Sequence, residues 1–188
     1  ELMLEDMKQI DILGSWLSNE RHINKHLKKC IKVKLPDLEP YYHTNPWTSA
    51  LAGKTVLVIH PFAKSIKNQY KHKRTKLFEN PNILPEFELK TIKAVQSVAG
   101  NKTEFSDWFE ALNHMKKLIN ETDFDIAIIG CGAYGFPLAA HIKRMGKQAI
   151  HMGGSTQLLF GIKGKRWDNH ELISNLFNEH WVRPNKDE

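Results

Sequence analysis

Three glycines with the spacing G-x-G-x-x-G follow an apolar run in the second half of the chain. They are Gly130, Gly132 and Gly135, and the run before them reads DIAII. Glycines between a strand and a helix allow a tight turn and close backbone approach to a phosphate, which the helix attracts with its free amides. Tyr134 lies within the same turn and is a further candidate contact. The stretch predicts a phosphate-binding turn; the alternative is that the glycines serve packing alone.

A second glycine turn and a basic loop lie further along the chain. Glycines and hydroxyl residues would open a helix after a predicted strand, and a glycine-interrupted basic loop follows. Arginine can bind a phosphate through two hydrogen bonds, and lysine acts as a point charge. The candidate residues are Gly153, Gly154, Ser155 and Thr156 in the turn and Lys163, Lys165 and Arg166 in the loop. The alternative is a solvated basic loop without a ligand.

The glycine spacing alone does not predict NAD. An NAD site expects Asp or Glu about 20 residues on, at the end of the next strand, for the ribose hydroxyls. Here that strand is predicted over residues 147–151, and the first acidic residue after it is Asp168. We therefore expect no NAD, and the same absence argues against an adenosine-bearing methyl donor.

Two histidines stand at the ends of predicted strands. His60 ends the run KTVLVIH, and His151 ends KQAIH. Imidazole titrates near neutral pH, so either residue is a candidate base or a hydrogen-bond donor to a diphosphate. The simpler interpretation of each is a hydrogen-bonded histidine at a strand end.

The elements that must position these residues alternate between strands and helices. Apolar runs predict strands over residues 54–60, 87–95, 125–129 and 147–151, and helical periodicity predicts helices over residues 3–27 and 63–78 and behind a cap at Ser106. A further strand is expected over residues 31–35, and Asp168 and Glu171 would form a capping box. Buried strands alternating with helices predict an α/β fold, a Rossmann-like parallel sheet with helices on both faces. We expect residues 1–52 to be an N-terminal helical and loop segment packing on the core, and residues 53–188 to be the Rossmann-like domain.

Composition narrows the class of protein and its partners. The chain has 188 residues and a net charge of +6, with no Asp or Glu in residues 40–78 or 126–167, which suggests an anionic ligand. Nucleic acid is an unlikely partner on this pattern, because the aromatic residues of the basic helix lie inward instead of among its lysines. No transmembrane segment is expected, and two cysteines without a disulfide framework indicate a cytoplasmic location. Oligomeric state is open. Because the chain begins with Glu1, we expect it to be a piece of a longer protein.

The stretch DFDIAIIGCGAYGFPLAAHIKRMGKQAIHMGG resembles the last βαβ unit of glycosyltransferases with the GT-D fold. The likeness covers about a fifth of the chain, and GKTVLVIHPF is similar to an earlier strand of that family. The chain as a whole is also similar to uncharacterised proteins found among polysaccharide-assembly enzymes. The resemblance implies a nucleotide-sugar donor, a glycan acceptor and sugar transfer.

The same resemblance implies a divalent metal, Mn²⁺ or Mg²⁺, at a D-x-E motif. The only such motif here is Asp37-Leu38-Glu39, which lies in a Pro-flanked loop and not after a strand. We therefore expect the true motif upstream of Glu1; the alternatives are that Glu39 does a related job as base or metal ligand, or that the activity is absent. The rival hypothesis for the whole chain is a non-catalytic nucleotide- or sugar-phosphate-binding domain of a larger protein.

Overall fold

A four-stranded parallel sheet forms the centre of the protein. The structure is a computed structural model, and it describes residues 1–27, 29–96 and 103–188. The strands are ordered β4-β3-β5-β6, and all three pairings are parallel. Their bounds are Thr55–His60 for β3, Glu88–Lys93 for β4, Ile126–Ile129 for β5 and Gln148–His151 for β6. The predicted α/β fold with a parallel sheet is confirmed.

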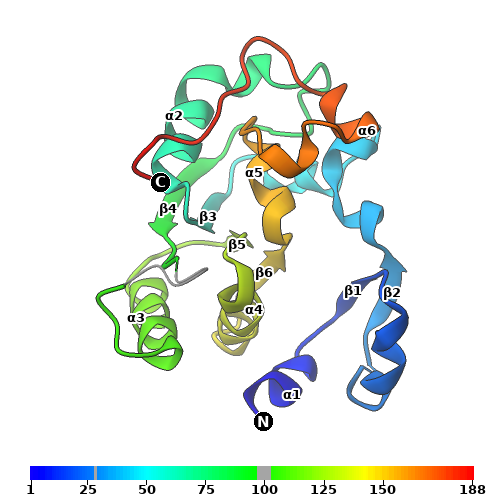
Figure 1. The fold of residues 1–188 in the computed structure, drawn as a ribbon, viewed down its shortest axis with the longest axis vertical. Coiled ribbons are helices and arrows are strands. Elements are labelled where there is room, and N and C mark those ends of the chain that lie inside the picture. The colour runs from blue at the N-terminus through cyan, green and yellow to red at the C-terminus, as the bar shows by residue number, and fades with distance from the viewer. Residues whose placement is uncertain (28, 97–102) are drawn as a thin grey trace.

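Helices cover both faces of this sheet, as the sequence predicted (Figure 1). On one face, α2 (Ala63–Lys73) and α5 (Thr156–Leu159) pack with Val56 and Val58 of β3. On the other face, α3 (Trp108–Asn120) and α4 (Gly135–Arg144) pack with the alternate residues of β3, Leu57 and Ile59. Both faces of a central parallel strand are buried in this architecture, which explains why the run VLVI is apolar throughout.

The order of the strands creates a crevice at one edge of the sheet. The chain goes from β3 outward to β4, then returns through α3 to place β5 on the other side of β3. The loops that follow β3 and β5 therefore lead away in opposite directions. In open α/β sheets, ligands bind at this switch point, beyond the carboxyl ends of the strands.

The N-terminal region differs from the prediction. Instead of a helix over residues 3–27, α1 (Leu2–Met7) is short, and β1 (Ile12–Ser15) follows it and pairs in parallel with β2 (Ile31–Lys34). The Glu20 carboxylate accepts hydrogen bonds from the backbone N–H groups of Trp16 and Leu17, so these amides are not available to a continuing helix. Short 3₁₀ helices, Ser18–His22 and Asn24–His26, complete the connection. The strand predicted over residues 31–35 is confirmed as β2.

Three local predictions were wrong at helix ends. The helix predicted over residues 63–78 stops at Lys73, where a 3₁₀ turn (Arg74–Lys76) begins. Helix α3 is capped by Asp107, which accepts from the Glu110 N–H at 2.8 Å, and not by Ser106. Helix α6 (Glu171–Ser174) is capped by the His170 ring, because the predicted cap, Asp168, binds Arg183 instead. The last two errors replace a predicted cap by a neighbouring residue.

An ion pair between a buried carboxylate and a half-exposed arginine joins α1 to α4. Asp6 is fully buried, and its Oδ1 accepts a hydrogen bond from Arg144 at 2.6 Å. Its other oxygen, Oδ2, has no hydrogen-bond partner among the described residues. A buried carboxylate left without its cation is costly, so this single pair makes the docking of α1 depend on Arg144.

We expect Arg144→Gln to lower the free energy of unfolding by about 2 kcal/mol, because it leaves the Asp6 carboxylate buried and unpaired. Urea denaturation followed by circular dichroism measures the change. Lys8→Gln is the matched control: it breaks the exposed pair with Glu5 and should cost less than about 0.5 kcal/mol. Equal losses in the two variants would contradict the interpretation of Asp6 as the anchor of α1.

Candidate functional site

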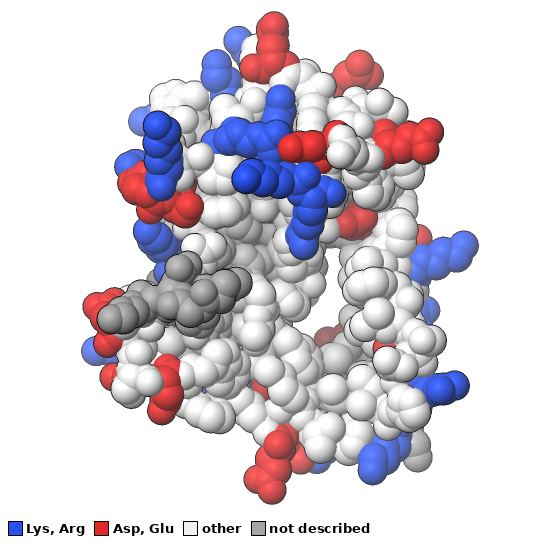
Figure 2. Space-filling model, in the orientation of Figure 1, with Lys and Arg blue, Asp and Glu red and all other residues white. Residues whose placement is uncertain are grey.

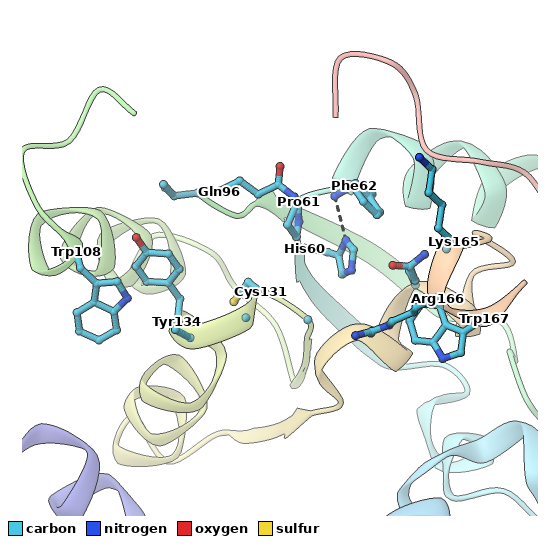
Figure 3. A pocket seen from close by; sticks show the side chains of 16 residues that line it. His60, Pro61, Phe62, Gln96, Trp108, Cys131, Tyr134, Lys165, Arg166 and Trp167 are labelled. Carbon is cyan, nitrogen blue, oxygen red and sulfur yellow. Dashed lines mark hydrogen bonds between the residues drawn. The ribbon is translucent and has the colours of Figure 1, made fainter. Parts of the chain in front are cut away.

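An open cavity of about 560 Å³ lies at the switch point, where β3 and β5 end. Its volume is within the range of small-molecule sites. Figure 3 shows Trp108 and Tyr134 at one end, Lys165, Arg166 and Trp167 at the other, and His60 between them. The lining residues are His60, Pro61, Phe62, Val95, Gln96, Trp108, Gly130, Cys131, Gly132, Ala133, Tyr134, Gln157, Gly164, Lys165, Arg166 and Trp167.

The predicted glycine turn forms the floor of this cavity. Gly132 has a φ of +56°, a left-handed conformation that favours glycine, and it opens a 3₁₀ turn (Gly132–Tyr134) that runs into α4. Gly130 is required for packing: a Cβ there would lie 2.5 Å from the Gly153 carbonyl oxygen and 2.7 Å from the His60 ring. The turn therefore has a packing role and also lines the cavity. Phosphate binding by this turn stays a prediction.

Two of the three predicted loop cations reach the cavity. Lys165 and Arg166 belong to a 3₁₀ turn (Lys165–Trp167) that faces the glycine turn (Figure 3). Lys163 does not line the cavity, because its ammonium group lies 5.3 Å from the centre of the Phe177 ring. No Asp or Glu occurs among the described residues that line the cavity, so its ionic charge comes from Lys165 and Arg166.

The Arg166 guanidinium is oriented by contacts that carry no charge. It lies 3.9 Å from the centre of the Trp167 ring, and it covers Gly154, where a Cβ would meet Nη2 at 1.4 Å. Gly154 has no side chain and so leaves room for the Arg166 guanidinium. A cation held over an aromatic face keeps its charge available for an anion.

An aromatic pair that the sequence did not predict forms the opposite end. The rings of Trp108 and Tyr134 stack at 5.3 Å with an interplanar angle of 9°. Trp108 is the first residue of α3, and only the fold brings it beside the glycine turn. Trp167 was also missed, although its position directly after Lys165 and Arg166 was a signal that could have found it.

His60 lies between the two ends and is held in one tautomer. Its Nδ1 accepts the backbone N–H of Phe62 at 3.0 Å, so the ring proton of the neutral form is on Nε2. Burial lowers the pKa of His60 from 6.5 to about 4, which keeps the ring neutral at pH 7. Of the two roles predicted for His60, this arrangement favours a hydrogen-bond donor over a base.

The remaining residues predicted near β6 have structural partners. His151 Nδ1 and Thr156 Oγ1 both lie 3.1 Å from the Ile129 carbonyl oxygen, and burial lowers the pKa of His151. A Cβ at Gly135 would lie 2.1 Å from the His151 ring, so that glycine accommodates the imidazole. The His151 and Thr156 side chains do not line the cavity, and neither do Gly135 and Gly153.

The D-x-E residues do not form a metal site. Asp37 accepts the backbone N–H of Lys34 at 2.8 Å, whereas Glu39 accepts a hydrogen bond from the Ser155 hydroxyl, on a different element. The buried Tyr41 hydroxyl is close to Glu39 and Ser155; burial, followed by the Glu39 charge, raises the pKa of Tyr41. Across residues 1–27, 29–96 and 103–188, no group of three or more His, Cys, Asp or Glu side chains is placed to hold a metal ion. The donors implied by the resemblance therefore do not fit Mn²⁺ or Mg²⁺ here.

Glycines with different neighbours test this description of the cavity. Gly130→Ala should lower the free energy of unfolding by about 2 kcal/mol, because its Cβ would meet backbone that cannot yield. Gly154→Ala should change it by less than about 0.5 kcal/mol, because the contacted atom is the end of the flexible, exposed Arg166 side chain. Urea denaturation of both variants measures the difference. A large loss for Gly154→Ala would show that Arg166 is rigidly built into the fold.

The buried His60 also predicts a pH dependence of stability. The unfolded chain takes up a proton near pH 6.5, whereas the native ring does so only near pH 4. The contribution of His60 to the free energy of unfolding is therefore complete above about pH 6.5. It falls by on the order of 3 kcal/mol as the pH drops towards about 4.

His60→Asn tests the assignment, because the asparagine Oδ1 can still accept the Phe62 N–H but does not titrate. The difference in unfolding free energy between pH 7 and pH 4.5 should be smaller in this variant than in the wild type. An unchanged difference would mean that other groups, such as His151, cause the acid sensitivity.

No family model, curated protein or solved structure matches the chain. Within the part of the chain that the structure describes, none of the helices has the length and apolar character needed to cross a membrane.

Proposed function

We propose that this cavity binds the diphosphate of a nucleotide-linked sugar and that the protein is a glycosyltransferase-like protein acting in glycan or polysaccharide assembly. The observation that carries the proposal is the meeting of Lys165 and Arg166 with the glycine turn in one cavity that has no described carboxylate. Loss of a nucleoside diphosphate leaves negative charge that cations and preorganised donors can stabilise. Such a cavity would bind the leaving group without a metal.

The other lining groups fit the remaining parts of such a donor. The neutral His60 offers an Nε2–H to a phosphate oxygen, and Gly132 exposes backbone in the turn before α4. Trp108 at one end and Trp167 at the other offer flat surfaces, of the kind on which bases and sugars pack. The ligand class supported best is thus a molecule with two phosphates between two less polar parts.

One observation favours the alternative, a binding domain without catalysis. Removal of the proton from an acceptor hydroxyl needs a base, and the described cavity lining holds neither Asp nor Glu. His60 is held with its proton on Nε2, and Glu39 is bonded to Ser155 outside the cavity lining. In this alternative the chain binds the nucleotide sugar, and a catalytic carboxylate belongs to another part of the protein.

We further propose that the protein works in the cytoplasm. Cys30 and Cys131 are both free thiols, and burial raises the pKa of the Cys131 thiol to about 12. Unpaired cysteines are the rule in reducing compartments.

We expect Lys165→Ala/Arg166→Ala to weaken UDP binding at least about tenfold, because each charge-assisted contact to a phosphate contributes on the order of 1.5 kcal/mol or more. Isothermal titration calorimetry with UDP and UDP-glucose measures affinity, and thermal shift compares NAD. The melting temperature of the free double variant should match that of the wild type, because neither side chain makes an ion pair in the described structure.

Lys71→Ala/Lys76→Ala is the matched control, because it removes two exposed charges that do not line the cavity. Its affinity for UDP should equal that of the wild type. Equal UDP affinity in all three proteins would overturn the proposed site, and a larger thermal shift with NAD than with UDP would overturn the proposed ligand. Release of UDP from bound UDP-glucose would favour the enzyme over the binding domain.

A further inference from the structure

The last residues of the chain connect the two walls of the cavity. In Figure 1 this segment crosses from the region of α6 over α2 and ends beside β4. We call residues 182–188 the C-terminal strap. One wall of the cavity is the turn before α2, with Pro61 and Phe62; the other is the 3₁₀ turn Lys165–Trp167.

The first part of the strap holds the wall that carries the cations. The Val182 carbonyl accepts the Lys163 N–H at 2.7 Å, and the Val182 N–H donates to the Gly161 carbonyl at 3.0 Å. Arg183 then donates to both carboxylate oxygens of Asp168, at 2.8 and 2.9 Å. Asp168 ends the turn that contains Lys165, whose carbonyl accepts the Asp168 N–H. Backbone and side-chain contacts of the strap thus fix both ends of the basic turn.

The last part of the strap holds the opposite wall. Helix α2 has no side-chain cap from its own N-terminal residue, Phe62. Instead, the Glu188 carboxylate accepts the N–H groups of Lys64 and Ser65, at 2.6 and 3.0 Å, and also the Ser65 hydroxyl. The Asn185 N–H donates to the same hydroxyl at 3.1 Å. A carboxylate on the first amides of a helix stabilises that turn by hydrogen bonding and by its charge.

The capped turn is continuous with the centre of the cavity. Phe62 is the residue before α2, and its N–H is the group that holds His60 Nδ1. Glu188 therefore acts on Phe62 and His60 through the first turn of α2. Arg183 acts on Lys165 and Arg166 through Asp168. The two ends of the strap act on different walls.

We propose that the C-terminal strap is a positioning element of the cavity: Arg183 and Glu188, which do not line it, set the separation of its two walls and so its affinity for a diphosphate. The part of this inference that concerns affinity rests on the proposed function. The part that concerns the walls does not.

The first experiment uses the ligand-free, full chain. Amide hydrogen exchange is measured for the wild type, Arg183→Gln, Glu188→Gln and the control Lys8→Gln, which breaks an exposed pair with Glu5 outside the strap. Arg183→Gln should raise exchange about fivefold in residues 165–168 only, and Glu188→Gln should do so in residues 63–66 only. Exchange that is unchanged in both segments overturns the proposal.

The second experiment measures UDP affinity by calorimetry. Each strap variant should bind about threefold more weakly and the double variant about tenfold more weakly, because separate walls contribute additively. Exchange of the two charges, Asp168→Arg with Arg183→Asp, should recover the affinity that Arg183→Gln loses. An equal loss in Lys8→Gln, or no recovery on charge exchange, counts against a positioning role.

The two proposals fail in different ways. If the wild type does not bind UDP, the proposed function is wrong, and the exchange pattern alone decides the strap. If Arg183→Gln does not fold, Arg183→Lys replaces it, because it keeps the charge and loses the planar guanidinium. It should then show a smaller increase of exchange in residues 165–168, and no increase overturns the proposal.

Discussion

The close approach of three chain segments around Gly130 is the constraint on which the cavity depends. Gly130 directly follows β5, and a Cβ there would lie 2.5 to 2.7 Å from the Gly153 carbonyl, the His60 ring and the Thr156 side chain. Because the tips of β3, β5 and β6 meet there, the loops that follow them diverge from one point. The crevice at a switch point is a property of strand order, but its narrow floor here is a property of one residue.

The same crowding explains why several polar residues that are candidates for ligand binding instead bond groups within the protein. The Ile129 carbonyl, at the tip of β5, receives the His151 ring, the Thr156 hydroxyl and the Met152 N–H, each at 3.1 Å. A strand-end carbonyl buried beneath a cavity needs such partners. Hydroxyls and imidazoles after a strand therefore do not by themselves indicate a ligand, since the sheet edge has its own polar groups to satisfy.

Much of the sheet and part of the site could be predicted because their signals are local. The run VLVI and the glycine spacing after DIAII each depend on neighbours in the sequence, and the basic loop is visible from charge alone. The roles predicted for Glu39 and Asp168 were wrong because their partners lie further along the chain: Glu39 bonds Ser155 across 116 residues, and Asp168 binds Arg183. Trp108 carries no periodic or charge signal, so its place beside Tyr134 follows from the fold only.

The described lining of the cavity is cationic because it contains Lys165 and Arg166 and also because it contains no carboxylate. Its cations lie on an exposed loop where water weakens them, yet no described carboxylate in the lining competes for them, and burial keeps His60 neutral. Arg166 is oriented by Trp167 and by the bare Gly154 instead of by an acidic partner. An ion pair would have fixed the guanidinium equally well but would have made an incoming phosphate displace its partner. Orientation by uncharged contacts would leave the full cationic charge for the proposed diphosphate, and this is the physical reason for proposing that the loop is a binding element.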